Sequence, residues 1–166
     1  GLSPLVVPQL KTITLGGAVT GLGIESASFR NGLPHESALE LDILTGAGDI
    51  VTASRTQYPD LFHAFPNSYG TLGYSVRLKI ELEPVKPFVS LRHLRFHTIE
   101  DLIADMERII ETGGYDGAPV DYLDGVAFSA QESYLCLGVQ TATPGPGSDY
   151  TDRQIYYRSL QHPDGE

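Results

Sequence analysis

The sequence predicts an α+β fold of mostly antiparallel strands with short helices, and three patterns along the chain carry this prediction. Residues 39–44 and 50–53 are typical of two strands joined by a glycine-rich turn, as in a β-hairpin. Residues 74–82 alternate between apolar and polar side chains, which is the period of a half-buried strand. Residues 98–112 repeat apolar side chains at helical spacing, with strand-like segments on both sides.

In the first half of the chain, short elements precede and follow the hairpin. The sequence GGAVTGLG is too rich in small residues for a packed strand, so we expect a short helix whose first amides are those of Gly16 and Gly17. Pro59 begins a helical turn over residues 61–65. In the strand 74–82 the alternation predicts that the apolar residues share one face, namely Tyr74, Val76, Leu78, Ile80 and Leu82.

The second half predicts a different unit. The sequence EPVKP at 83–87 interrupts the strand pattern and indicates a domain boundary, which divides the chain into residues 1–84 and 85–166. A strand over 88–96 precedes the helix, which Thr98 caps and the glycines at 113–114 end. Strands near 123–128 and 133–140 follow. This β-α-β-β order is half of a ferredoxin-like split β-α-β motif.

The composition limits the classes of partner. The 166 residues carry a formal net charge of −10, which disfavours nucleic acid and anionic membranes as partners. No apolar stretch reaches the roughly 20 residues of a membrane-spanning helix, so we expect no stable membrane span. The five histidines lack metal-ligand spacing, so we expect no metal site. Cys136 is the only cysteine, which excludes an intrachain disulfide and favours a cytoplasmic location.

The segment from Thr14 to Gly32 is the strongest sign of function, because it holds five glycines in nineteen residues. Glycine allows the backbone to come close to a ligand, and amides beside small hydroxyls suit a phosphate or pyrophosphate. The segment has neither a complete Rossmann fingerprint nor a Walker lysine. The residues alone therefore leave two interpretations open, a phosphate cradle and a glycine-rich corner between packed elements.

Three segments in a fixed order add a family resemblance. They are TLGGAVTGLGIESASFRNG at 14–32, LELDILTGAGDIVTAS at 39–54 and PDLFHAFPNSYGTLGYSVRLKIELEPV at 59–85. In this order they resemble the second half of the FAD-binding domain of the vanillyl-alcohol-oxidase-like, or PCMH-type, flavoproteins. GIESAS, RNGL, PDLFH and PNSYGTLG resemble in particular the delta24-sterol reductase (diminuto-like) branch. The similarity covers most of residues 9–140.

The resemblance implies which residues hold FAD. Main-chain groups at the start of the glycine run would approach the flavin ring and the pyrophosphate, and those further along would continue the contact. In order these residues are Thr14, Leu15, Gly16, Gly17, Gly21, Leu22, Gly23, Ile24, Glu25 and Ser26. The main chain of Ile50 would pair with the edge of the adenine. Ser28, Gly32 and Gly73 are weaker candidates, and no residue is assigned a catalytic role.

The resemblance also implies an activity. It is hydride transfer between the flavin and a carbon of a lipid-like substrate of the sterol side-chain type, with NADPH or NADH as electron donor in the reductive direction. The alternatives are an FAD-dependent oxidase or dehydrogenase of sugars or alcohols, and a non-catalytic module that retains the fold. Peripheral attachment of the longer protein to a membrane is the alternative to a purely cytoplasmic location.

We further expect the chain to be an internal segment of a longer flavoprotein. Residues 1–84 would be the C-terminal half of the FAD-binding domain, and 85–166 the beginning of a substrate (cap) domain. The segment alone would then hold FAD poorly or not at all. Its exposed apolar surface would favour self-association.

Overall fold

The computed structural model describes residues 1–10 and 12–147. These residues form two compact units, one from Leu2 to Glu83 and one that comprises Gly1 and the residues from Pro84 onward. We refer to them as the N-terminal unit and the C-terminal unit and describe each by itself. The sequence has an apolar-aromatic cluster at Ile155, Tyr156 and Tyr157, which lies outside the described residues.

The N-terminal unit contains five strands and four short helices in the described residues. In chain order they are β1 (Leu2–Pro4), α1 (Leu15–Gly21), α2 (Ser28–Asn31), the 3-10 helix η1 (Pro34–Ser37), β2 (Ala38–Leu44), β3 (Ile50–Ser54), α3 (Pro59–Ala64), β4 (Tyr74–Ile80) and β5 (Leu82–Pro84). The predicted hairpin, the short helix after Thr14 and the helical turn after Pro59 are confirmed. The pairing of the short strands β1 and β5 was not predicted, and neither were the helices α2 and η1. All of these elements are too short to show a sequence period.

The main sheet of this unit has the strand order β3-β2-β4, and both pairings are antiparallel. The pairing of β2 with β4 shifts where Asp42 lies opposite Arg77 but Ile43 lies opposite Ser75, so Val76 has no partner. Such a bulge reverses the faces of a strand beyond it. The prediction that Tyr74 and Leu78 share a face is therefore wrong, because Leu78 pairs with the buried Leu41 whereas Tyr74 pairs with Leu44 on the other face.

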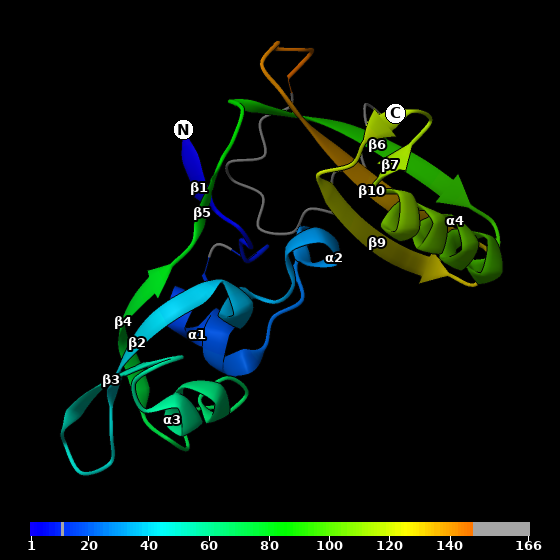
Figure 1. Ribbon diagram of the computed structural model, residues 1–166. Coiled ribbons are helices and arrows are strands. Elements are labelled where there is room, and N and C mark those ends of the chain that lie inside the picture. The colour runs from blue at the N-terminus through cyan, green and yellow to red at the C-terminus, as the bar shows by residue number, and fades with distance from the viewer. Residues whose placement is uncertain (11, 148–166) are drawn as a thin grey trace. The chain divides into compact units, whose positions relative to one another are not determined.

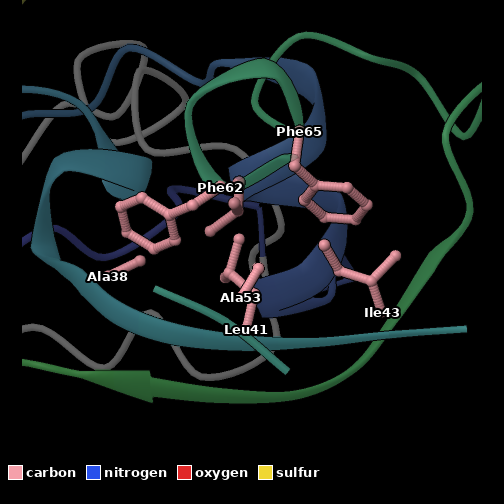
Figure 2. Close-up of a cluster of buried hydrophobic side chains, with 7 residues drawn as sticks. Ala38, Leu41, Ile43, Ala53, Phe62 and Phe65 are labelled. Atoms are coloured by element: carbon pink, nitrogen blue, oxygen red, sulfur yellow. The ribbon is translucent and has the colours of Figure 1, made fainter. Parts of the chain in front are cut away.

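One face of this sheet is covered by α1 and α3 (Figure 1). Figure 2 shows the core between them, where Phe62 of α3 and Phe65, the C-cap of that helix, lie over Leu41 and Ile43 of β2. Val19 of α1 completes this core from the same side; the remaining buried members are Ala38 and Ala53. Because helices of six or seven residues are marginal by themselves, packing on this sheet is what holds α1 and α3 in place.

The periphery of the N-terminal unit is closed by a bidentate ion pair between α2 and β5. Two nitrogens of Arg30 donate to the two carboxylate oxygens of Glu83 over 2.9 and 2.8 Å. Asn31 donates to the carbonyl oxygen of Leu5 and also approaches Glu83. The hydrogen bond from Arg30 is the main reason that the pKa of Glu83 is lowered. This ion pair links α2, near the end of the glycine run, to β5, the last strand of the unit.

The C-terminal unit is built around one long helix on a three-stranded sheet (Figure 1). Its elements are β6 (Phe88–Phe96), α4 (Ile99–Thr112), the short strands β7 (Gly114–Tyr115) and β8 (Ala118–Pro119), β9 (Tyr122–Ser129) and β10 (Glu132–Thr141). The sheet order is β6-β10-β9, and both pairings are antiparallel. This is the strand order of a split β-α-β motif.

The helix α4 begins and ends where its sequence predicts. The side chain of Thr98 accepts from the amide of Asp101 over 3.2 Å, and Gly113 ends the helix in the left-handed conformation. Its buried residues Leu102 and Ile109 face the sheet, where Leu135 and Leu137 of β10 are also buried. None of the helices in the two described ranges is long and apolar enough to cross a membrane.

We predict that truncating Phe65 to alanine destabilises the N-terminal unit by about 3–5 kcal/mol, because the ring is fully buried and the sheet cannot close the cavity. Urea unfolding followed by circular dichroism measures this change. Ile24→Ala is the matched control, since this apolar side chain is 80% exposed and should cost less than about 0.5 kcal/mol. Equal losses in the two variants would contradict the core as described.

We also predict that Gly73→Ala costs at least about 2 kcal/mol. Gly73 has a φ of +129°, and an added Cβ would overlap the carbonyl oxygen of Leu44. Gly46→Ala is the control, because Gly46 lies in the hairpin turn with open space around it and no positive φ. The difference between the two midpoints of thermal unfolding tests the prediction, and it should vanish if the close approach at Gly73 is absent.

Candidate functional site

The helix α1 places the beginning of the glycine run. Thr14 is its extended N-cap, and its Oγ1 accepts from the amide of Gly17 over 3.1 Å. The first turn carries no acidic residue. Within the described residues nothing accepts from the amides of Leu15 and Gly16, which are the donors that a helix leaves open at its N-terminus. This end of α1 therefore presents two amide donors and a threonine hydroxyl, without a carboxylate that would repel an anion.

Two glycines in the first turn of α1 have different neighbours. A Cβ at Gly16 would lie 3.6 Å from Cβ of Ser75, an ordinary contact between α1 and β4. A Cβ at Gly17 would lie 3.2 Å from Oγ1 of Thr14, the atom that caps the helix. A side chain at Gly17 would therefore crowd the open N-terminal end of α1. A side chain at Gly16 would instead contact β4.

At the C-terminal end of α1 the main-chain amides already have acceptors within the helix. Leu22 adopts the left-handed conformation at φ 50°, and the amides of Leu22 and Gly23 both donate to the carbonyl of Ala18. Tyr69 binds this end from outside, because its hydroxyl donates to the carbonyl of Gly21 and its amide donates to that of Thr20, both over 3.4 Å. The turn PNSYGTLG at 66–73 is therefore attached to the end of the glycine-run helix.

The run continues past α1 as an irregular segment. Ile24 is largely exposed, whereas Glu25 is held on both sides: its amide donates to Ser28 Oγ over 3.0 Å, and its carboxylate accepts from the amide of Gln9 over 2.8 Å. Burial raises the pKa of Glu25. Ser26 is half-buried. The contact with Gln9 has no local signal in the sequence and was not predicted.

Ile50 lies on a different element from the rest of the predicted site. It opens β3, pairs with Leu44 and is 62% exposed. Tyr74 of β4 lies on the other side of Leu44 and is 71% exposed, so an apolar row crosses the sheet on the face away from the core. No hydrogen bond or ring contact between described residues joins Ile50 to the glycine run.

The rest of that sheet face is charged. Arg77 of β4 forms ion pairs with both Asp42 and Glu40 of β2, and Thr52 donates to Asp42 over 2.8 Å. The hydrogen bond from Arg77 is the main reason that the pKa of Asp42 is lowered. Two carboxylates neutralise the charge of this guanidinium, so the cluster links β4 to β2 and offers no excess positive charge to a ligand.

Two groups of proteins are similar to this chain. Over 125 residues the chain is 36% identical to cytokinin dehydrogenase 6 of Oryza sativa subsp. japonica, which is 75% of this chain and 24% of that protein. Over 138 residues it is 30% identical to the delta(24)-sterol reductase of Rattus norvegicus, which is 82% of this chain and 25% of that protein. The human delta(24)-sterol reductase matches at 30% over 141 residues.

The chain spans about a quarter of the length of these curated relatives. No family model matches it. Both groups of relatives are FAD-binding flavoproteins of the PCMH type, the family that the order of the sequence motifs indicates. At 30–36% identity across three quarters or more of its residues, the chain belongs to the FAD-binding PCMH-type flavoprotein family.

Proposed function

We propose that the protein containing this chain is an FAD-dependent oxidoreductase and that the chain supplies part of its FAD site. The observation that carries this proposal is the homology of three quarters or more of the chain to two groups of FAD-dependent oxidoreductases. FAD accepts or donates a hydride, and the protein contributes binding, orientation and electrostatics. The residues of this chain would therefore act on the cofactor by holding it.

The N-terminal end of α1 fits the anionic part of FAD. The open amides of Leu15 and Gly16 can donate to pyrophosphate oxygens, and the hydroxyl of Thr14 still has its own proton to donate after accepting from Gly17. The absence of an acidic residue in this turn supports the same assignment. Gly17 keeps the approach open, because it places no side chain beside Thr14.

Residues 22–25 of the glycine run would contact FAD through groups other than their main-chain amides. The amides of Leu22, Gly23 and Glu25 already have acceptors within the protein. We infer that this part offers carbonyl oxygens and the exposed side chain of Ile24. Gly21 and Ser26 complete the proposed contact.

Ile50 is proposed to pair with the adenine through its main chain. β3 is an edge strand of its sheet, so one side of its backbone has no strand partner in the described residues. An adenine edge presents a donor beside an acceptor, which an open strand edge can match. The exposed side chains of Ile50 and Tyr74 would give the base an apolar surface.

For the reaction, we propose reduction of a lipid-like substrate of the sterol side-chain type, with NADPH or NADH as the electron donor. The relatives named delta(24)-sterol reductase support it. The second candidate is dehydrogenation of a small molecule, which the 36% identity to a cytokinin dehydrogenase supports. Turnover assays of the intact protein with sterol side-chain alkenes and with cytokinins distinguish these reactions.

Two further assignments rest on the same family relationship. We propose that the N-terminal unit belongs to the FAD-binding domain and that the C-terminal unit begins the substrate domain. We propose a cytoplasmic location, with attachment to a membrane surface as the alternative, and self-association of the isolated segment through its exposed apolar residues.

The proposal predicts that Gly17→Val in the intact protein lowers flavin occupancy at least tenfold, because the branched side chain would crowd Thr14 and the open amides. The visible absorbance of bound flavin after purification measures the occupancy. Gly17→Ala adds a single methyl group and should give a smaller loss.

Gly145→Val is the matched control, because a Cβ there meets nothing within 4 Å. Thermal unfolding of the flavin-free forms separates loss of cofactor from loss of fold. Flavin occupancy in a folded Gly17→Val protein equal to that of the control would refute the assignment of the glycine run.

A further inference from the structure

A hollow of about 230 Å³ opens beside the core of the N-terminal unit, and none of its lining residues belongs to the proposed FAD site. Its apolar side includes Ala38, Leu41 and Phe62. In Figure 2 the ring of Phe62 lies beside Ala38 at one end of the core cluster. The hollow therefore borders the packed apolar core, whose side chains form its base.

The polar side of the hollow comes from three segments that are distant in the sequence. His35 lies in η1, Arg55 follows β3, and His63 lies in α3. Glu36 also lines the hollow, but one of its carboxylate oxygens already accepts from the amide of Leu33 over 2.7 Å. An arginine and two imidazoles thus gather at one place in a chain whose formal net charge is −10.

Arg55 differs from the other arginines of the described residues. Arg30, Arg77, Arg92, Arg95 and Arg108 each form an ion pair with a carboxylate. Arg55 forms none within those residues, and its Cζ lies 5.9 Å from the centre of the Phe62 ring. A guanidinium that lies near an aromatic ring at the edge of a hollow and pairs with no carboxylate of the described residues has its donors available for an anion.

His35 adds a second unsatisfied group. Its Nδ1 is buried and has no hydrogen-bond partner among the described residues. A buried polar nitrogen without a partner is costly, and such groups usually bind water or a ligand.

We propose that this hollow binds a small carboxylate with an apolar body. The carboxylate would pair with Arg55 and receive hydrogen bonds from the imidazoles of His35 and His63, while its body would lie on the floor at Phe62. The negative charge of Glu36 favours a singly charged ligand over a doubly charged phosphate. The volume lies below the range of roughly 300–1,000 Å³ for drug-sized ligands, which limits the ligand to a compact molecule.

Titration of the chain with benzoate tests the proposal, with the imidazole proton resonances of His35 and His63 as the readout. Both should shift in a saturable manner, whereas those of His93 and His97 should not. Substitution of His35 or His63 by glutamine, one at a time, assigns the resonances. Benzamide has the same body without the charge and should bind at least tenfold more weakly. Inorganic phosphate has charge without an apolar body and should also bind more weakly than benzoate.

Arg55→Gln should weaken benzoate binding about tenfold or more, which corresponds to about 1.4 kcal/mol. Arg95→Gln, an exposed arginine of the C-terminal unit, should leave it unchanged. Arg55 is exposed and forms no hydrogen bond or ion pair within the described residues. The substitution removes only its approach to the Phe62 ring, so the unit should stay folded. Absence of shifts at both imidazoles, equal affinity for benzamide, tighter binding of phosphate, or equal affinity of the two arginine variants would each overturn the proposal.

Discussion

Burial of one apolar sheet face is the constraint on which the N-terminal unit depends. The helices α1 and α3 have seven and six residues, too few to be stable without tertiary contacts. They persist because Val19, Phe62 and Phe65 are removed from water against β2. The open amides at the start of α1 and the imidazole of His63 on α3 are held by this packing. Both proposed sites are thus fixed by the same core.

The sequence patterns predicted elements well where a local signal was strong, and poorly where pairing decided the outcome. The helix α4 carries its own cap at Thr98 and its own stop at Gly113, and the hairpin carries its own turn, so each could be recognised from neighbouring residues. The bulge at Val76 has no such signal, because it arises from how β4 pairs with β2. It turns Ser75 toward the core side, where a Cβ at Gly16 of α1 would meet it at an ordinary contact distance.

The candidate sites show the same division. The glycine run could be proposed as a site because its residues are contiguous and their order is typical of a family, but the sequence does not reveal which of its amides already have acceptors within the protein. That depends on contacts such as Ser28 with Glu25, which only the folded chain shows. The hollow was not predicted at all, because His35, Arg55 and His63 come from three segments that share no motif. In the sequence, single histidines and arginines look like ordinary surface residues, and only the fold shows that these three lie at one place.

The two groups of relatives bear on what this segment does. Their names refer to different molecules, a cytokinin and a sterol, yet each group matches three quarters or more of this chain at comparable identity. A segment that serves enzymes with different substrates is expected to serve what those enzymes have in common, which is FAD. The open helix end at Leu15 and Gly16 suits that role, because main-chain donors recognise a pyrophosphate without regard to the substrate. Residues that select the substrate should therefore be sought away from the glycine run.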